Sequence, residues 1–210
     1  MSAEARFDGG QGKMTTGALR IALAGNPNCG KTTVFNAYTG ARQHVGNYPG
    51  VTVDRKEGHV RHGNADITLV DLPGTYSLTA YSMEELVARA ELGSGDVQAV
   101  INVVDASALE RNLLLTVQMM EMGLPVVLVC NMMDEARKAG VHIDMERLSA
   151  MMGIPVVSAV ARTGEGLQQA LGEAVRLAGE GRHQVLELNY GADIDEGLRA
   201  MCAIINREGL

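Results

Sequence analysis

The stretch IALAGNPNCGKTT at residues 21–33 decides the fold of this chain. Four apolar residues, typical of a buried strand, run directly into a loop that carries Gly25 and Gly30, and then into a segment of helix length. From Gly25 to Thr32 the loop reads G-x-x-x-x-G-K-[ST], and it has the strand–loop–helix context that this motif requires. The stretch therefore predicts a phosphate-binding loop at the end of the first strand of an α/β fold.

The groups in this loop are suited to bind the phosphates of a nucleoside triphosphate. Successive backbone N–H groups of a glycine-rich turn, together with a helix N-terminus, surround phosphate oxygens with donors. Lys31 is expected to supply positive charge to the β and γ phosphates, and the Thr32 hydroxyl to ligate the Mg²⁺ that bridges them. The residues expected to contact the phosphates are Gly25, Asn26, Pro27, Asn28, Cys29, Gly30, Lys31, Thr32 and Thr33.

Beyond this loop, apolar segments of strand length alternate with amphipathic segments of helix length. This alternation predicts a mostly parallel sheet flanked by helices. Strands are expected at residues 20–25, 59–61, 66–71, 99–105, 125–130 and 154–157. Helices are expected at residues 31–38, 83–92, 108–122, 145–152 and 166–177.

Several helix ends carry capping signals. Ser82 with Glu85, and Ser107 with Glu110, have the Ser-x-x-Glu spacing of a capping box, which predicts two helix starts. Glycines expected to close helices in a left-handed conformation are Gly93, Gly123 and Gly153.

A second motif, Asp71-Leu72-Pro73-Gly74, follows another apolar run. Asp71 is placed to hold the Mg²⁺, through water, and the Gly74 amide to sense the γ-phosphate. Taken alone, an acid followed by Pro-Gly is more often a plain turn. This interpretation therefore depends on the phosphate loop that precedes it.

The motif NMMD at residues 131–134 follows an apolar strand and predicts the choice of base. The Asp134 carboxylate is able to accept hydrogen bonds from N1–H and the 2-amino group of guanine, a donor pair that adenine lacks, while Asn131 would brace the loop. A backbone amide after the next strand would bind the guanine carbonyl oxygen. The residues expected around the base are Asn131, Met132, Asp134, Ser158, Ala159 and Val160.

The segment between the two phosphate-binding motifs has the composition of a switch. Residues 46–53 combine turn chemistry with Thr52, which is the candidate second hydroxyl ligand of Mg²⁺, beside Val51. Such a segment orders when the γ-phosphate is present and loosens after hydrolysis. Without a phosphate loop before it, an ordinary surface loop would be the better interpretation.

Together these motifs resemble the FeoB family of ferrous-iron transporters, over about residues 18–178. The resemblance implies a Ras-like P-loop GTPase domain that binds GTP and GDP, hydrolyses GTP with Mg²⁺, and regulates iron uptake through a membrane domain absent from this chain. The motifs that carry it are residues 25–33 (GNPNCGKTT), 45–53 (VGNYPGVTV), 56–58 (KEG), 71–78 (DLPGTYSL) and 131–134 (NMMD).

The resemblance also implies activation by K⁺. Ras-like enzymes orient water with a Gln where this chain has Thr75, so slow intrinsic hydrolysis is expected. In potassium-activated relatives, an Asn equivalent to Asn28 and switch carbonyls, here near Gly46 and Tyr48, hold the cation beside the phosphates. The residues expected to be catalytic are Asn28, Lys31, Thr52 and Gly74.

Length and composition set limits on the other functions. The chain has 210 residues, a net charge of −7 and a pI near 5.2, which do not favour nucleic acid as the main partner. Three scattered cysteines suit a reducing cytosol, and no apolar run reaches the roughly 18 residues of a membrane span. We expect a domain at the cytoplasmic face of the bacterial inner membrane, with the oligomeric state left open.

The sequence predicts three regions. Residues 1–17 are expected to be a disordered arm or an expression remnant, and residues 18–180 the GTPase domain. Residues 181–210 are interpreted as the truncated start of a helical, GDI-like regulatory domain, with a helix near residues 193–205; a lone docking helix is the alternative. The rival functions are an RNA-associated tRNA-modification or ribosome-assembly GTPase, and a nucleotide-binding switch without turnover.

Overall fold

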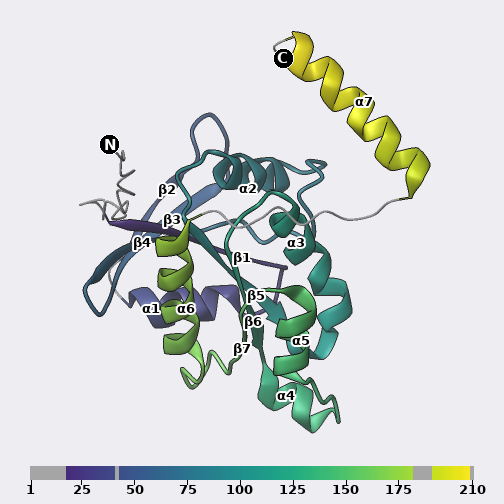
Figure 1. The fold of residues 1–210 in the computed structure, drawn as a ribbon. Coiled ribbons are helices and arrows are strands. Elements are labelled where there is room, and N and C mark those ends of the chain that lie inside the picture. Colours follow the sequence, from purple (N-terminus) through teal and green to yellow (C-terminus); the bar gives the residue numbers. More distant parts are fainter. Residues whose placement is uncertain (1–17, 41–42, 182–190, 209–210) are drawn as a thin grey trace, which may run out of the picture.

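The computed structural model describes residues 18–40, 43–181 and 191–208. Within these residues a seven-stranded sheet has the order β2-β3-β4-β1-β5-β6-β7 (Figure 1). The strands are β1 (Leu19–Gly25), β2 (Gln43–Asn47), β3 (Asp54–His62), β4 (Ala65–Asp71), β5 (Ala99–Asp105), β6 (Val126–Asn131) and β7 (Val156–Ser158). The helices are α1 (Lys31–Thr39), α2 (Met83–Gly93), the short η1 (Ala106–Ala108), α3 (Leu109–Glu121), α4 (Met133–Lys138), α5 (Met145–Met152), α6 (Leu167–Glu180) and α7 (Ala192–Glu208).

The sheet is mostly parallel, as the sequence predicts. Strands β4, β1, β5, β6 and β7 are parallel neighbours, whereas β3 pairs antiparallel with both β2 and β4. Because the parallel strands run in one direction, their carboxyl ends meet at one edge of the sheet, where open α/β folds bind ligands. The residues that end these strands are Gly25, Asp71, Asp105, Asn131 and Ser158.

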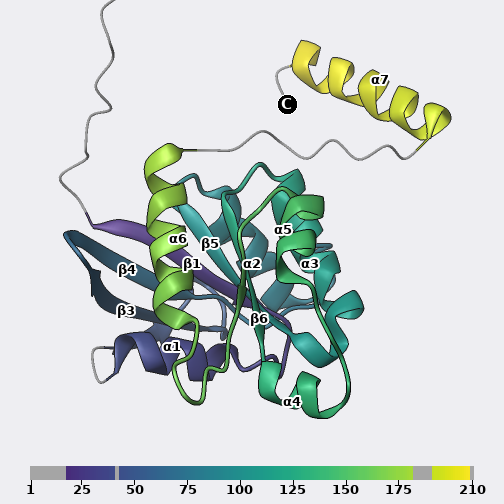
Figure 2. The same ribbon diagram turned by 60° about the horizontal axis from the view of Figure 1, so that its bottom comes forward.

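Alternate residues of the central strand feed two separate cores. Ile21 and Leu23 face the layer of α1 and α6, where they join Phe35 and Leu171. Ala22 faces the opposite layer, which contains residues of α2 and α3. Figure 2 shows α6 and α3 on different sides of the strands. Because β6 is buried at every position and β5 at all but its last, these central strands are almost continuous apolar runs without polar alternation.

Most predicted elements are confirmed, with β5 and α5 at the predicted bounds, but β2 and α4 were missed. All five residues of β2 are exposed, so this strand carries no apolar pattern. It forms by pairing with residues 54–58 of β3. This pairing also extends β3 beyond its predicted residues 59–61. Helix α4 has only six residues and begins inside the NMMD motif. Short or exposed elements of this kind depend on tertiary partners more than on local pattern.

The capping predictions were partly wrong. Ser82 accepts a hydrogen bond from the Glu85 N–H, and Gly153 ends α5 in the left-handed conformation, as expected. Asp105 takes the place expected of Ser107: its carboxylate accepts from the Ser107 N–H, and no side chain caps α3. The prediction for the Ser107–Glu110 pair fails because the intervening turn is a separate 3₁₀ helix.

The predictions for the glycines at the helix ends were also only partly correct. Gly123 has a positive φ of 68°, as predicted, after the last residue of α3. Gly93 remains helical as the last residue of α2, and Gly95 carries the positive φ instead. The helix continues through Gly93 because Ser94 still donates its N–H to the Glu91 carbonyl.

The predicted C-terminal helix is confirmed as α7, which Figures 1 and 2 show apart from the sheet and its helices. Its apolar side chains Ile194, Leu198 and Met201 are exposed. That α7 begins a second domain stays a prediction, and the interpretation of residues 1–17 lies outside the described residues. No helix within the described part of the chain has the length and apolarity needed to cross a membrane.

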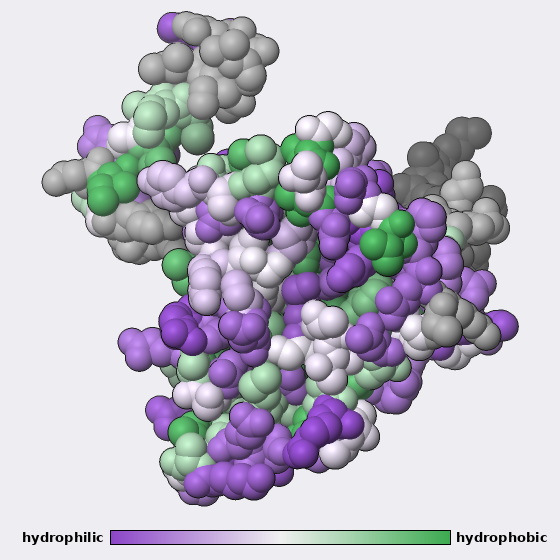
Figure 3. All heavy atoms as spheres, turned by 180° about the vertical axis from the view of Figure 1, so that it is seen from behind, coloured by the Kyte–Doolittle hydropathy of each residue, from purple (hydrophilic) through white to green (hydrophobic). Residues whose placement is uncertain are grey.

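On the face shown in Figure 3, hydrophilic side chains predominate and apolar ones form separate small patches. The exposed large apolar residues outside α7 are Val45, Tyr76, Tyr81, Met83, Leu86, Leu114 and Met151.

One glycine contact explains how α6 is joined to β7. Gly166 has φ 78°, and a β carbon there would lie 2.0 Å from the Ser158 carbonyl oxygen. Gly164 has a similar φ of 84° but open space around it. Gly166→Ala should therefore lower the unfolding free energy by about 3 kcal/mol or more, and Gly164→Ala by about 1 kcal/mol, because only the first adds a clash with backbone to the cost of positive φ. Urea denaturation measures both, and equal losses would contradict the contact.

Candidate functional site

Asn131 joins three loops at the carboxyl edge of the sheet. Its side-chain Nδ2 donates to the Cys29 carbonyl at 2.9 Å, in the glycine-rich loop after β1. Its Oδ1 accepts from the Ala161 N–H at 2.9 Å, in the loop after β7. With 2% of its surface exposed, Asn131 makes these bonds away from water. The position of each loop therefore depends on the other two.

The glycine-rich loop fits tightly against this side chain. Gly30 is the N-cap of α1 with φ 85°, and a β carbon there would lie 2.3 Å from the Asn131 Nδ2. Glycine is thus required by both conformation and space. Asn28 in the same loop also has a positive φ, of 66°, and is exposed. The buried Asn26 has no hydrogen-bond partner for either side-chain amide atom.

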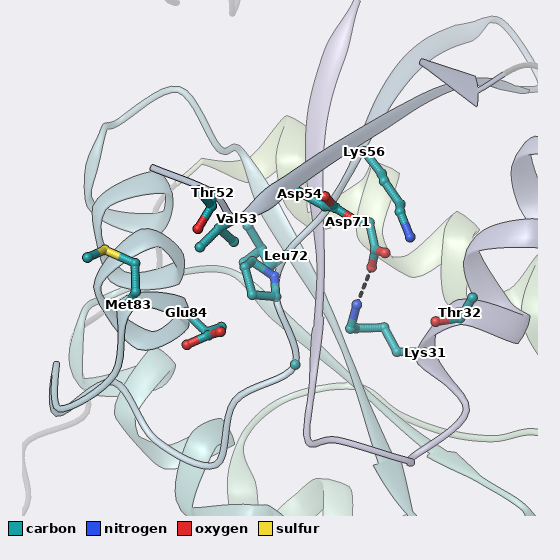
Figure 4. Close-up of a pocket in the computed structure, with 12 residues that line it drawn as sticks. Lys31, Thr32, Thr52, Val53, Asp54, Lys56, Asp71, Leu72, Met83 and Glu84 are labelled. Atoms are coloured by element: carbon teal, nitrogen blue, oxygen red, sulfur yellow. Dashed lines mark hydrogen bonds and ion pairs between the residues drawn. The ribbon is translucent and has the colours of Figure 1, made fainter. Parts of the chain in front are cut away.

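A charged cavity lies beside the loop, at the ends of β1 and β4. Lys31 forms an ion pair with Asp71, and both side chains are largely buried (Figure 4). The cavity, of about 440 Å³, is also lined by the predicted residues Thr32, Thr52 and Gly74. The structure therefore brings the predicted cation, acid and two hydroxyl groups together.

Two further cavities continue the first. One, of about 510 Å³, is lined by residues 26–28 of the loop and shares Lys31, Thr32 and Gly74 with the charged cavity. It also shares Gly30 and Met132 with a cavity of about 170 Å³ at the NMMD motif. The three cavities adjoin through shared lining residues, and we refer to this row of cavities, from Lys31 to Asp134, as the groove.

The NMMD motif bends sharply into α4. Met132 adopts a left-handed conformation, with φ 60°, at the N-cap of α4, a strain typical of binding sites. Asp134, in the first turn, forms an ion pair with Arg162, whose Nη2 lies 2.6 Å from the Asp134 Oδ2. Burial raises the pKa of the Asp134 carboxyl, but the pairing with Arg162 outweighs it and holds this pKa below its ordinary value.

The segment after the strand that ends at Asp71 is also fixed to the loop. Thr75, which is buried, donates its N–H to the Gly25 carbonyl at 3.3 Å. A β carbon on Gly74 would lie 3.5 Å from Pro27, so Gly74 packs against the loop without a clash. The predicted phosphate sensor thus lies directly beside the phosphate-binding loop.

Other predicted residues lie apart from this groove. Gly46 is exposed in β2, and the side chain of Tyr48 is buried in an apolar groove against α2, which Val51 also lines. Among the described residues that line the cavity of Asn28, neither Gly46 nor Tyr48 occurs. The predicted K⁺ ligands are therefore not assembled in this arrangement.

The residues after β7 divide between structure and site. Ala159 donates its N–H to the Cys130 carbonyl and accepts from the Met133 N–H, so its own polar groups are used within the fold. The buried Ser158 hydroxyl has no partner. Val160 lines the cavity at the NMMD motif, as does Thr33 in the first turn of α1.

Sequence reasoning missed several residues at the site. Asp54, Lys56 and Glu84 line the charged cavity, and Arg162 covers Asp134. Lys56 belongs to the KEG motif of the resemblance but was given no role at the site, and the other three are ordinary surface charges in the sequence. The only available signal was position, since Asp54 follows the switch segment and Arg162 follows the residues predicted to contact the base.

The two cysteines near the site are packing groups. Cys29 and Cys130 are both buried. Burial raises the pKa of the Cys29 thiol to about 11 and that of Cys130 to about 12. Both thiols therefore stay protonated near neutral pH, which makes them poor nucleophiles.

A mostly parallel sheet of this order, with a glycine-rich loop that leads to Lys31 and the NMMD motif at the same edge, defines the fold of the Ras-like P-loop GTPases. The chain belongs to the family described as "Ferrous iron transport protein B", whose model matches residues 19–174.

Among curated proteins, the chain is 50% identical over 194 residues to a Fe(2+) transport protein A/Fe(2+) transporter FeoB fusion protein of Porphyromonas gingivalis, covering 90% of this chain and 23% of that protein. It is 52% identical over 164 residues to the Fe(2+) transporter FeoB of Salmonella typhimurium, covering 76% of this chain and 21% of the relative. The chain thus spans less than a quarter of the length of these relatives.

Solved structures show the same fold. The cytosolic domain of the T. maritima FeoB iron transporter in GDP form II superposes with a TM-score of 0.86 at 40% identity, covering 90% of this chain and 75% of that one. The cytosolic domain of L. pneumophila FeoB gives 0.84 at 39% identity, covering 91% and 75%.

The Asn131 bridge predicts an unusually large effect for one side chain. Asn131→Ala would leave the buried Cys29 carbonyl and Ala161 N–H without partners, so the unfolding free energy should fall by about 2–4 kcal/mol. Asn36→Ala is the matched control, because within the described part of the chain the Asn36 side chain makes a single, exposed bond, to Gln43. It should change stability by less than about 0.5 kcal/mol. Thermal and urea unfolding measure both. Equal effects would contradict a bridging role.

Proposed function

We propose that this chain binds GTP and GDP with Mg²⁺ and hydrolyses GTP, as the nucleotide switch of a longer ferrous-iron transporter. The observation that carries the proposal is the row of adjoining cavities from Lys31 to Asp134, with a lysine and a glycine-rich loop at one end and a carboxylate able to accept from guanine at the other. The GDP-bound form of the T. maritima relative supports it.

The residues around the charged cavity suit Mg²⁺. The hydroxyl groups of Thr32 and Thr52 and the carboxylate of Asp71 are hard oxygen donors, the kind that Mg²⁺ prefers. When bound, Mg²⁺ would neutralise charge on the β and γ phosphates. Lys31 would then exchange its ion pair with Asp71 for the phosphates, which carry more negative charge.

Hydrolysis of GTP requires a correctly oriented water and neutralisation of the phosphate charge more than it requires a strong base. The loop amides and Lys31 would hold the phosphates in line for attack by water, and the Gly74 amide would bind the γ-phosphate. Thr75 offers no carboxamide to orient the water, and its N–H already donates to Gly25. Slow intrinsic turnover follows from this arrangement.

Base choice would rest on Asp134. Its carboxylate would accept the N1–H and 2-amino hydrogen bonds of guanine, and an adenine base would leave this acceptor unpaired. Val160 and the neighbouring amides would surround the base. Met132 would lie between the base and the glycine-rich loop, because it lines both cavities there.

We further propose that K⁺ assists catalysis. The proposal is supported by the exposed Asn28, which lines the same cavity as Lys31; its side-chain oxygen would ligate a cation next to the phosphates. The carbonyls of Gly46 and Tyr48 would have to approach Asn28 when the switch segment orders. The cation would offset charge in the transition state, as an arginine finger does.

The remaining partners belong to the whole protein. The nucleotide state of this chain would regulate a membrane-embedded iron-transport domain outside it. This chain would lie at the cytoplasmic face of the inner membrane, and α7 would belong to a regulatory helical domain. A homo-oligomer stays an open prediction, and no nucleic acid is expected as a partner. An RNA-associated GTPase is disfavoured by the net charge of −7 and by the family match.

Thr52→Ala tests the enzyme and its switch together. It should reduce release of phosphate from GTP at least tenfold (about 1.4 kcal/mol) while GDP affinity stays nearly unchanged, because this hydroxyl would meet Mg²⁺ only in the triphosphate state. Thr52→Ser, which keeps the hydroxyl, is the control and should retain most of the activity. Equal losses of GDP and GTP binding would contradict the switch role, and no phosphate release by the unaltered protein would contradict the enzyme.

Potassium dependence is a separate expectation. Replacing Na⁺ by K⁺ at constant ionic strength should raise the turnover of the unaltered protein, because only the better-fitting cation would offset charge beside the phosphates. Asn28→Ala should make the rates in the two salts equal. Equal rates for the unaltered protein in both salts would exclude the cation mechanism.

A further inference from the structure

Arg162 occupies the acceptor that a guanine base would need. It lies in the loop after β7, and its Nη2 is 2.6 Å from the Asp134 Oδ2. Both residues line the cavity at the NMMD motif, with Asn131 and Ala161. Another charged residue, Glu135, lines the same cavity. In the described structure, however, the hydrogen bond of the Arg162 guanidinium goes to Asp134.

The two demands on this carboxylate conflict. Guanine presents two parallel donors, N1–H and the 2-amino group, which match both oxygens of one carboxylate, in the way a guanidinium does. Arg162 already takes Oδ2. A carboxylate oxygen has a second acceptor position, but Arg162 also lines the cavity in which the base would lie. A base and Arg162 in its present position would therefore compete for this oxygen and for the space beside it.

We propose that Arg162 is a competitor of the guanine base for Asp134, which weakens nucleotide binding and speeds release of GDP. The inference rests on the proposed function, since it needs a guanine nucleotide in this groove. It assigns to the loop after β7 a regulatory side chain in addition to its backbone contacts with the base.

The side chain is free to leave, whereas its loop is not. Arg162 is 74% exposed, so its guanidinium reaches water when it gives up Asp134. The backbone around it is held by the Ala161 bond to Asn131 and by a turn in which Thr163 and Gly164 donate to the Val160 carbonyl. Rotation of the Arg162 side chain alone is therefore enough to open the carboxylate.

The size of the effect follows from the exposure of the pair. Exposed ion pairs contribute little, so competition by Arg162 should change the affinity by about two- to fivefold and no more. Salt screens exposed charges, so the competition should fade as ionic strength rises. This modest size suits tuning of nucleotide release; it would not block binding.

The test compares Arg162→Ala with the unaltered protein by stopped-flow release of GDP that carries a fluorophore on its ribose. Release from Arg162→Ala should be about two- to fivefold slower, with correspondingly tighter binding, and the difference should shrink in high salt. Arg162→Gln should behave in the same way, because it also removes the charge. Arg176→Ala is the matched control: Arg176 is an exposed, ion-paired arginine on α6, and its loss should leave release unchanged.

The outcomes separate this inference from the proposed function. Equal or faster release from Arg162→Ala overturns the competition, and faster release would mean that Arg162 holds Asp134 ready for the base. A difference that persists in high salt also overturns it. Failure of the unaltered protein to bind GDP contradicts the proposed function itself.

Discussion

The hydrogen bonds of the Asn131 side chain fix the distance between loops that the sheet alone does not hold together. Strands β1, β6 and β7 bring their carboxyl ends to one edge, but the loops beyond them leave the regular ladder. One amide donates to Cys29 and accepts from Ala161, away from water, where an unpaired backbone group would be costly. The loop that carries Lys31, the turn that carries Asp134 and the loop that carries Arg162 are therefore held at fixed positions relative to one another.

The parts of this site that depend on chain-local chemistry were predictable. The glycine-rich loop, the acid that ends β4 and the NMMD motif follow buried strands whose apolar runs are plain in the sequence, and parallel strands bring such ends together by geometry. Contacts between remote surface charges were not predictable. Arg162 meets Asp134 across 28 residues, and nothing in the sequence separates it from other exposed arginines. Likewise β2 has no apolar residues facing a core, and exists only through its pairing with β3.

A second set of charges connects the two elements that follow the predicted switch segment (residues 46–53) and the loop that begins after Asp71. The Arg20 guanidinium on β1 reaches Glu57 on β3 at 2.9 Å and Glu91 on α2 at 2.6 Å. Partial burial raises the pKa of the Glu57 carboxyl, but its bonds to Arg20 and Arg55 outweigh this and lower the pKa. Strand β3 follows the predicted switch segment, and α2 follows the loop after Asp71 that contains Gly74 and Thr75. A rearrangement of either segment would thus be resisted by a charge cluster that both flanking elements share.

The buried side chain of Tyr48 is a second restraint on the movement of residues 46–53. Its ring is buried against α2, with the Arg55 guanidinium 5.6 Å from the ring centre, and its hydroxyl has no hydrogen-bond partner. Thr52, four residues later, is exposed and lines the charged cavity. The predicted switch segment, residues 46–53, is therefore anchored at Tyr48 and unrestrained at Thr52. An anchored Tyr48 side chain leaves its backbone carbonyl less able to approach Asn28, whereas the exposed Thr52 has no such restraint. The ordering of this segment around a triphosphate would then proceed from Thr52 toward Tyr48. In the last step the Tyr48 hydroxyl would leave a buried position in which it has no hydrogen-bond partner, and this release would favour the step.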